Sequence, residues 1–315
     1  VFGLSVALGF VILLASYAKT EFSVGAKQPL SKQLYVVGAG DSFGMTLGTS
    51  EEFFPSIPEI KGWTRICFVG TADIMVGDDY YRAAEVSIDT NFFKFFDYRL
   101  TGCLKDKVLE NEDEVILSES FAKKVFGNED PIGRILSVDK SKWTVVGVVE
   151  DFGPVDVFEH CDVFTSIKRA QKQFAWMDNF GNTVPIVRLD EGTDVEKVRE
   201  DLLKKYLGYW NFYKADNSDN AFLWGASVTR LDKVYFSGMN SYTCLRTGDR
   251  KQVELLFIVA LVLLISAIFN YINLTVAQTG KRAKEMATRR LLGESSRNIV
   301  TRYITESFAF TVGGF

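Results

Sequence analysis

Two stretches of this sequence contain no charged residue, and they constrain the fold more than any other feature. The longer run is residues 255–277, LLFIVALVLLISAIFNYINLTVA, and the shorter one is residues 1–18, VFGLSVALGFVILLASYA. A helix needs about 20 mostly apolar residues to cross the hydrocarbon core of a bilayer. We therefore predict a first transmembrane helix at residues 1–18 and a second at residues 255–277.

The first run also fits a cleaved signal peptide, because the small residues of SYA stand just before Lys19. A signal peptide begins with a basic stretch, whereas this sequence starts inside an apolar run. We therefore favour a span, and we expect the sequence to be a fragment without its natural N-terminus. Residues 299–315 resemble the start of a truncated third span, since one helical face carries Ile299, Val300, Tyr303, Ile304, Ser307 and Phe308.

The distribution of charge predicts the side of the membrane on which each segment lies. The chain has a net charge of −4, yet the residues after 277 contain seven basic side chains and three acidic ones. This leaves a net charge of −8 for residues 19–254. Basic residues close to the ends of spans are retained in the cytoplasm. Residues 278–298 are therefore predicted to be cytoplasmic, and residues 19–254 extracytoplasmic.

Residues 19–254 have the pattern of a folded α+β domain, which we expect to be two-lobed, with a mixed sheet and helices. Short β-branched runs predict strands at 114–118, 143–150, 184–189 and 224–231. A helix is predicted at 119–127, before a turn at 128–133 and further strands. A second helix is predicted at 193–207, with a capping box of Thr193 and Glu196 and a buried stripe of Val195, Val198, Leu202 and Tyr206. The polar residues 214–221 are predicted to form a loop.

The motifs that would support catalysis are weak or missing. Gly38 and Gly40 follow a strand-like run, as in a dinucleotide-binding turn, but Phe43 stands where that motif needs a third small residue. An ordinary glycine turn is the better interpretation. The sequence has no GxxxxGK[ST] phosphate loop, and its one histidine, His160, lacks the partners of a metal site or a serine nucleophile. We therefore expect no enzyme activity, no metal and no cofactor in this chain.

All four cysteines, Cys67, Cys103, Cys161 and Cys244, lie in the predicted extracytoplasmic part, where disulfides are chemically permitted. Four cysteines allow three pairings, and the sequence does not choose among them. Unpaired buried thiols are an equally good interpretation.

The stretch 280–298, GKRAKEMATRRLLGESSRN, predicts a short basic helix between two spans. Glu285 and Arg289 are four residues apart in the favourable order, Gly293 stands where a helix would stop, and Ser295 or Ser296 can cap the next helix. Anchoring by positive charge and attraction to anionic lipid explain part of this composition. The mixture of acidic, apolar and basic residues is better suited to a protein surface.

Residues 270–308, NYINLTVAQTGKRAKEMATRRLLGESSRNIVTRYITESF, resemble the core of FtsX/MacB-like permeases. Residues 114–152, EVILSESFAKKVFGNEDPIGRILSVDKSKWTVVGVVEDF, resemble the MacB-like periplasmic core domain, and RLDKVYF at 230–236 resembles its terminal strand returning to the membrane. The resemblance implies the permease subunit of an ABC transporter, which couples ATP hydrolysis by a partner ATPase to export or to motion of the extracytoplasmic domain. It places ATPase coupling at Arg282, Lys284, Glu285, Arg289, Arg290 and Gly293.

The same resemblance implies a bacterial inner-membrane protein whose large domain lies in the periplasm. Its expected partners are the ABC ATPase, which binds ATP, a second permease unit as a homodimer or duplicated half, and a periplasmic or outer-membrane protein; no nucleic acid is expected. Small residues let helices approach closely, so we predict that the first span packs on another span through Gly3, Ser5, Ala7 and Gly9. The alternatives are a two-span sensor receptor with an extracytoplasmic ligand-binding domain, or a membrane-anchored structural domain.

Overall fold

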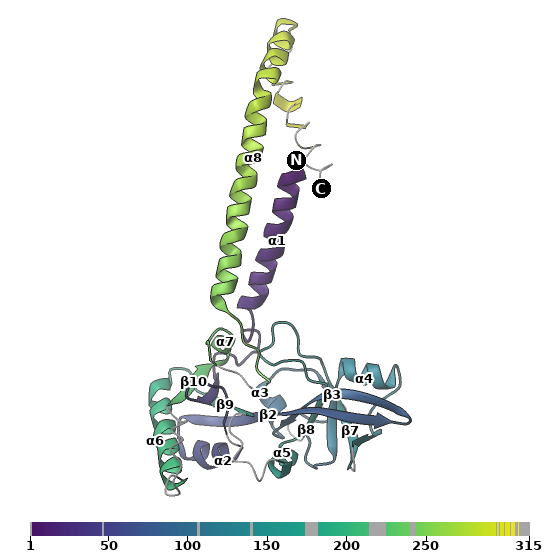
Figure 1. The fold of residues 1–315 in the computed structure, drawn as a ribbon, viewed down its shortest axis with the longest axis vertical. Helices are drawn as coiled ribbons and strands as arrows, with labels where there is room; N and C mark the ends of the chain where they lie inside the picture. Colours follow the sequence, from purple (N-terminus) through teal and green to yellow (C-terminus); the bar gives the residue numbers. More distant parts are fainter. Residues whose placement is uncertain are drawn as a thin grey trace. The chain divides into compact units, whose positions relative to one another are not determined.

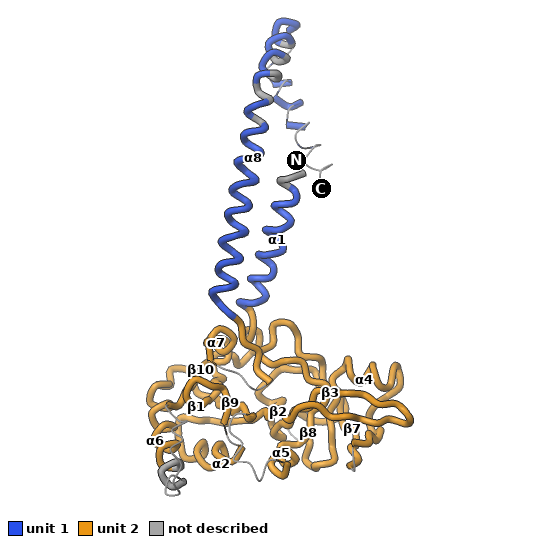
Figure 2. The backbone as a smooth tube through the Cα atoms, viewed as in Figure 1, with its two compact units in different colours: residues 1–22, 249–315 blue, residues 23–248 orange. Residues whose placement is uncertain are grey.

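The structure is a computed structural model, and its chain divides into two compact units, residues 1–22 with 249–315 and residues 23–248 (Figure 2). It describes residues 2–45, 47–105, 108–138, 141–173, 182–213, 225–239, 244–293, 295, 297, 298, 300–302, 304, 305 and 308. Each unit is described separately below.

The unit of residues 23–248 is built on one ten-stranded mixed sheet (Figure 1). Its strand order is β10-β1-β9-β2-β3-β8-β5-β7-β4, with β6 paired to β2 and β7. The β3–β8 and β5–β7 pairs are parallel, and the other pairs are antiparallel. The strands are β1 (Leu34–Ala39), β2 (Ile60–Val76), β3 (Asp79–Ile88), β4 (Leu100–Thr101), β5 (Glu114–Ser118), β6 (Ile135–Val138), β7 (Ser141–Val149), β8 (Val163–Ser166), β9 (Thr183–Leu189) and β10 (Ala226–Arg230).

Helices cover parts of this sheet and contribute residues to its hydrophobic clusters. They are α2 (Thr49–Phe53), the 3-10 helix η1 (Phe54–Ser56), α3 (Phe92–Phe95), α4 (Glu119–Phe126), α5 (Ile167–Gln173), α6 (Val195–Tyr213) and α7 (Leu231–Val234). One buried cluster contains residues of α4, β5 and β7, and another contains residues of α2, β9 and α6. The largest cluster is rich in phenylalanine and includes α3 and β8. The α+β class is confirmed. One continuous sheet contributes strands to both the cluster around α4 and the cluster around α6.

The predicted strands at 114–118, 143–150 and 184–189 are present as β5, β7 and β9. The helix α4 begins where Ser118 Oγ accepts a hydrogen bond from Phe121 N at 3.3 Å, and Gly127 follows it with a φ of +62°. In this way the sequence sets both ends of the helix, since a serine cap satisfies a free N–H and glycine readily adopts positive φ.

The helix α6 confirms the predicted amphipathic segment but not its cap. Val198, Leu202 and Tyr206 are buried and Val195 is half-buried, as the predicted stripe requires. The capping residue is Asp194, whose Oδ1 accepts hydrogen bonds from the amides of residues 196 and 197 at 3.1 and 3.3 Å. A carboxylate accepts charge-assisted bonds, which are stronger than those of a threonine hydroxyl.

The segment RLDKVYF is not the predicted terminal strand. The extended part ends at Arg230, and residues 231–234 form the one-turn helix α7. Leu231 and Val234, three residues apart, are both fully buried. A helical turn places such residues on the same face, whereas a strand would point one of them away from the core. The polar loop predicted at 214–221 lies outside the described residues.

The other unit contains the helices α1 (Phe2–Phe22) and α8 (Arg250–Leu291), which pack side by side (Figure 2). Segments Ser5–Phe22 and Arg250–Leu274 are long and apolar enough to cross a membrane. Only 6% of the second segment is buried, so α8 is not the core helix of a soluble protein. Of the six residues on the predicted face of the third span, residues 300, 304 and 308 are described, and all three are helical and exposed.

The helix α8 differs from the separate span and short basic helix that we predicted. It runs unbroken for 42 residues through the basic stretch. It stops near Gly293, whose φ is +86°, as predicted from the glycine. Beyond this stop, Ser295 Oγ accepts a hydrogen bond from Asn298 N at 3.3 Å, so Ser295 caps the next turn. A tail of good helix formers, with no glycine or proline between Lys281 and Leu292, explains why the helix continues.

Candidate functional site: a clamp on both connecting segments

The loop between β7 and β8 holds both chain segments that connect residues 23–248 to the two long helices. We call residues 23–31 the entry segment, residues 244–248 the exit segment and residues 153–159 the clamp loop. In the entry segment, Gly25 N donates a hydrogen bond to Val155 O at 2.9 Å, and Gln28 Nε2 donates one to Asp156 Oδ1 at 3.4 Å. The clamp loop therefore contacts the chain directly after α1.

The exit segment pairs with the same loop as a short antiparallel ladder. Arg246 N donates to Val157 O at 2.8 Å, Glu159 N donates to Cys244 O at 2.7 Å, and an isolated bridge lies between them. The guanidinium of Arg246 also donates to Pro154 O and Asp156 O, and it lies 5.6 Å from the centroid of the Tyr235 ring. Backbone and side chain together fix the last residues before α8.

Asp156 gives the clamp loop its shape. Its Oδ2 accepts a hydrogen bond from Gly153 N, and its own amide donates to Gly153 O at 3.1 Å, which closes a turn. The Gly153-Pro154 pair suits such a turn, because proline presets φ. The other oxygen, Oδ1, accepts from Tyr98 Oη at 3.1 Å. Burial, together with the carboxylate of Asp156, raises the pKa of Tyr98 well above its ordinary value. The phenol therefore stays protonated and acts as the hydrogen-bond donor.

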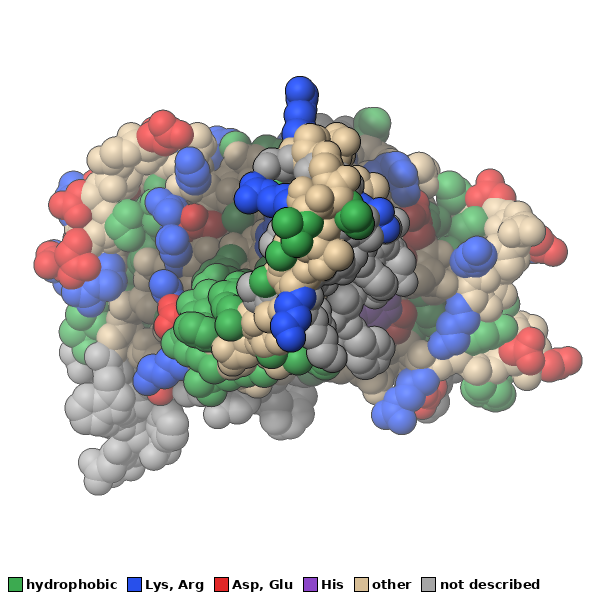
Figure 3. All heavy atoms as spheres, turned by 90° about the horizontal axis from the view of Figure 1, so that it is seen from above, with side chains coloured by type: hydrophobic (Ala, Val, Ile, Leu, Met, Phe, Trp, Pro, Cys, Tyr) green, Lys and Arg blue, Asp and Glu red, His purple; other side chains and the backbone are tan. Residues whose placement is uncertain are grey.

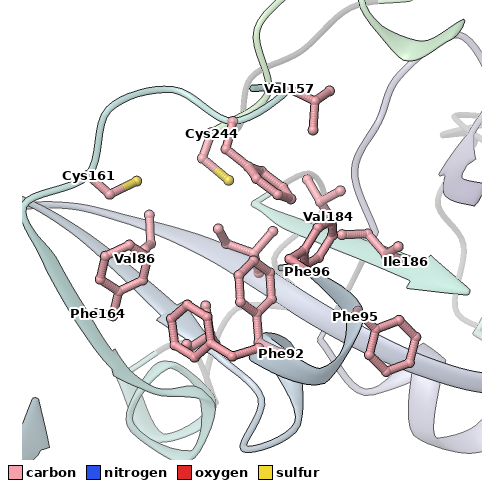
Figure 4. Close-up of a cluster of buried hydrophobic side chains, with 14 of the residues drawn as sticks. Val86, Phe92, Phe95, Phe96, Val157, Cys161, Phe164, Val184, Ile186 and Cys244 are labelled. Atoms are coloured by element: carbon pink, nitrogen blue, oxygen red, sulfur yellow. The ribbon is translucent and has the colours of Figure 1, made fainter. Parts of the chain in front are cut away.

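Aromatic side chains anchor the clamp loop to the largest core cluster. Phe152, just before the loop, lies 4.8 Å from Tyr98 and 5.5 Å from Phe164, measured between ring centroids. Phe158, inside the loop, lies 5.1 Å from Phe96 and 5.6 Å from Phe92. Figure 4 shows part of this cluster. The loop that holds both connecting segments is thus continuous with the largest buried cluster of the domain.

A glycine in each connecting segment permits this close packing. Gly25 has a φ of +74°, and a Cβ there would lie 2.7 Å from Leu231 O. A Cβ on Gly248 would lie 2.3 Å from the ring of Tyr235, whose carbonyl accepts a hydrogen bond from Gly248 N at 2.8 Å. Real Cβ atoms do not approach other atoms this closely, so the entry segment needs glycine at residue 25, and a side chain at residue 248 would have to displace the Tyr235 ring.

The residues predicted for ATPase coupling all lie on or just after the C-terminal part of α8. Lys284 and Arg290 are exposed there, and Gly293 follows the helix end. Arg282, Glu285 and Arg289 belong to the same helix, but their side chains lie outside the described residues. The coupling role therefore stays a prediction.

The residues predicted for span packing lie on α1. Ser5 and Ala7 are half-buried, whereas Gly9 is exposed and a Cβ there would have no neighbour within 4 Å. Gly3 also lies on α1, but its exposure is outside what the structure describes. Gly9 is thus accessible for a helix outside this chain, and its use for packing stays a prediction.

The remaining motifs have structural explanations. Gly38 precedes, and Gly40 lies within, a tight turn in which Ala39 N donates to Ser42 O at 3.1 Å, and Gly40 has a φ of +62°. His160 Nε2 lies 3.0 Å from Asp162 Oδ1. Within the described part of the chain, no group of three His, Cys, Asp or Glu side chains is arranged to hold a metal. Figure 3 shows acidic and basic side chains intermixed on the face in view.

Sequence reasoning did not identify the clamp. Most of its hydrogen bonds use backbone atoms, and its parts are far apart in the sequence. The one local signal is the Gly-Pro pair at 153–154, which marks a turn. It does not say what that turn binds.

Comparison with curated proteins gives distant relatives of one kind. MacB of Neisseria meningitidis, a macrolide export ATP-binding/permease protein, is 23% identical over 244 residues, which is 76% of this chain and 33% of that protein. MacB of Bdellovibrio bacteriovorus is 22% identical over 200 residues, or 63% of this chain and 29% of that protein. The chain therefore spans about a third of the length of these relatives.

A solved structure and a family model agree with these relatives. A domain of a proposed permease protein from Porphyromonas gingivalis has a TM-score of 0.51 at 20% identity, covering 73% of this chain and 99% of that domain, which shows a shared fold. The model of the MacB-like periplasmic core domain family matches residues 1–205, well over half of the chain. This protein, with an extracytoplasmic domain between two apolar helices, therefore belongs to the MacB-like periplasmic core domain family.

Proposed function

We propose that this chain is the permease part of an ABC transporter of the MacB/FtsX type. The observation that carries the proposal is the family match over residues 1–205, which joins the first apolar helix to the extracytoplasmic domain. The match favours this function over a two-span sensor. ATP is hydrolysed by an ATPase outside this sequence, and the chain converts that reaction into motion of its extracytoplasmic domain, so it is no enzyme itself.

The clamp supports this proposal because it joins both connecting segments to one loop. A displacement of α1 enters the domain through the entry segment, and a displacement of α8 enters it through the exit segment, by continuity of the chain. Both segments bond to carbonyls within residues 154–157. That loop is packed on the aromatic core. The clamp loop is therefore one place at which movements of both helices would reach the sheet.

The length of α8 supports coupling across the membrane. Its 42 residues correspond to roughly 60 Å at 1.5 Å per residue, about twice the 30 Å hydrocarbon core of a bilayer. One unbroken helix therefore extends from Arg250, next to the exit segment, to the predicted coupling residues. An unbroken helix transmits a movement of one end to its other end.

The coupling residues would bind the partner ATPase on the cytoplasmic side of a bacterial inner membrane. A second permease unit and a periplasmic or outer-membrane protein complete the proposed assembly. No described contact identifies the cargo.

An exchange of two residues tests whether the basic end of α8 is a docking surface or only a charged anchor. Swapping Glu285 and Arg289 keeps composition and net charge, and it costs the helix only a few tenths of a kcal/mol. The matched control swaps Arg250 and Glu254 at the other end of α8, which are also four residues apart and form a 2.7 Å ion pair.

We expect the Glu285/Arg289 swap to abolish co-purification of the ATPase and ATP-driven transport by the full-length protein in membranes. Insertion should be normal, because the positive charge that directs topology is unchanged. The Arg250/Glu254 swap should bind the ATPase normally. Normal ATPase binding in both variants would refute specific docking and leave the basic stretch as an anchor.

A further inference from the structure

A cleft of about 600 Å³ lies in the domain, at a place where β2 meets α2 and α5. It is lined by part of β2, by residues 89–91 after β3, by the end of β8 with the start of α5, and by Glu51 of α2. None of its described lining residues belongs to the clamp loop. Sites for small molecules have volumes of about 300–1,000 Å³, so the cleft is large enough to hold one.

A buried arginine is fixed in this cleft before any ligand arrives. The Arg65 side chain is 2% exposed. Its Nε and Nη2 donate to Asp89 at 3.0 and 2.8 Å, and Nη2 also donates to Glu51 at 2.8 Å. Its Nη1 donates to Leu47 O at 2.6 Å, and the guanidinium lies 5.0 Å from the centroid of the Trp63 ring. These contacts leave the arginine no freedom to rearrange.

Two buried polar atoms of the lining lack a hydrogen-bond partner among the described residues. One is Oγ of Ser166, a residue that is 0% exposed. The other is Oδ1 of Asn91. Asn91 Nδ2 donates to Trp63 O at 3.0 Å, which fixes the orientation of the amide. Buried polar groups are nearly always hydrogen-bonded, and each exception needs an explanation. A ligand in the cleft would supply both missing partners.

The charge of the lining favours a ligand without charge. The described lining residues include two cationic side chains, Arg65 and Lys168, and two anionic ones, Glu51 and Asp89, so their net charge is zero. A cationic ligand would share the cleft with the buried Arg65 guanidinium. An anion without N–H or O–H groups would have nothing to donate to Asn91.

The two unpartnered atoms favour hydroxyl groups on the ligand. Asn91 Oδ1 can only accept a hydrogen bond, whereas the hydroxyl of Ser166 can donate or accept one. A ligand hydroxyl can also donate or accept, so one neutral functional group satisfies both atoms. Hydrogen bonds between a ligand hydroxyl and the carboxylate of Glu51 would be charge-assisted and therefore stronger than neutral ones.

We propose that this cleft binds a small, uncharged molecule with several hydroxyl groups, of about the size of a monosaccharide. Ser166 and Asn91 bind its hydroxyls from the two sides of the β3–β8 strand pair. Gln171 Nε2 of α5 donates to Glu51 Oε1 of α2 at 2.9 Å, so a ligand at these residues contacts both helices. This site is separate from the clamp and independent of the proposed transport function.

Saturation-transfer NMR tests for such binding, because it detects weak complexes of small molecules. The full chain is placed in phosphatidylcholine nanodiscs, whose lipid carries no sugar, and empty nanodiscs are the blank. The probes are D-glucose, D-galactose and D-mannose, each used alone, with methylammonium and acetate as charged probes. We expect saturation transfer to at least one sugar and none to the charged probes.

Two serine variants form a matched pair. Ser166→Ala removes a hydroxyl that has no partner in the described structure, so the fold should be kept, and sugar binding should be on the order of tenfold weaker. The control is Ser50→Ala. Ser50 is also 0% exposed and its Oγ also lacks a partner among the described residues, but it does not line the cleft. This control should bind the sugar as the wild-type chain does.

Three results would overturn the proposal. The first is no transfer to any of the three sugars, which would leave the cleft to water. The second is transfer to methylammonium or acetate in place of the sugars. The third is equal sugar binding by the wild-type chain and Ser166→Ala.

Hydrogen exchange of the wild-type chain decides the question even where a variant fails to fold. A saturating concentration of the bound sugar should slow amide exchange in peptides covering residues 166–171 and leave β7 unchanged. Unchanged exchange at 166–171 would place the sugar outside the cleft and would also overturn the proposal.

Discussion

Replacing Arg246 with methionine should loosen the exit segment without unfolding the domain. Methionine keeps an apolar stem of similar length on the Tyr235 ring but has no guanidinium. The wild-type Arg246 Nη1 donates to Pro154 O and, at 3.3 Å, to Asp156 O. The backbone bond from residue 246 to Val157 O remains available in the variant. The perturbation therefore removes the side-chain part of the clamp alone.

The expected cost follows from these contacts. A hydrogen bond made by a charged group contributes about 1.5–3 kcal/mol, and an exposed cation–π pair contributes about 0.5–1 kcal/mol. One nitrogen serves both carbonyls and the side chain is half-exposed, so the lower ends of these ranges apply. A total of about 2 kcal/mol corresponds to a roughly 30-fold larger opening equilibrium.

Amide hydrogen exchange measures this opening directly. The amides of Arg246 and Gly248 donate to Val157 O and Tyr235 O, so they are protected while the exit segment is closed. In Arg246→Met, peptides covering 244–248 should exchange about 30-fold faster, while β5 and β7 keep their protection. The control is Arg230→Met, because Arg230 forms its ion pair with Asp232, two residues away in the sequence. Losing this part-buried local pair removes an arginine side chain without removing a hydrogen bond to the clamp loop.

Two results would refute this reasoning. Unchanged exchange at 244–248 in Arg246→Met would mean that the guanidinium bonds do not hold the segment. Equal acceleration in β5, β7 and the exit segment would mean that the variant destabilises the whole domain rather than the clamp. Arg246→Lys should be intermediate, since an ammonium keeps the charge but lacks the planar fork of donors.

Two further substitutions test the packing around the site and within the sheet. Gly25→Ala should lower the melting temperature more than Gly192→Ala, because both glycines have positive φ but only Gly25 has a neighbour, Leu231 O, in the space of a Cβ; equal shifts in calorimetry would show that the contact is unimportant. Arg65→Met should lower the free energy of unfolding, measured with denaturant, by about 3–5 kcal/mol, since it leaves the largely buried Asp89 carboxylate without its 2.8 Å partner. Adding Asp89→Asn should recover part of this loss. No recovery would exclude an unpaired charge as the cause.

Sequence patterns predicted the elements whose signals are local. The strands β5, β7 and β9 have β-branched runs, and α4 carries its own serine cap and terminal glycine, so each was located within about two residues, as is usual for element ends. The apolar runs predicted α1 and α8. The family resemblance, which rested on motifs from both the domain and the basic stretch, is confirmed by the family match.

The failures have physical causes that the local sequence does not contain. The strand predicted at 230–236 rested on the family resemblance, but burial of both Leu231 and Val234 requires a helical turn. The cap of α6 depends on whether the side-chain oxygen of Thr193 or that of Asp194 reaches the free amides. The oxygen of Asp194 does so. The basic stretch was expected to form its own helix because it follows the predicted end of a span. Membrane thickness limits the length of the apolar part of a helix, but it does not limit the length of the whole helix.

The clamp shows why the most informative contacts escaped prediction. The entry and exit segments bind carbonyls of residues 154–157, and every residue type offers a carbonyl. The shape of the loop depends on the carboxylate of Asp156, which binds Gly153 on one side and Tyr98 on the other. A change of side chain at residue 155, which is half-buried, keeps its carbonyl acceptor in place, whereas loss of the Asp156 carboxylate frees the turn that positions the acceptors. The sequence constraint is therefore concentrated in the residues that shape the loop and in the few contact residues, Gly25 and Arg246, whose own atoms the clamp requires.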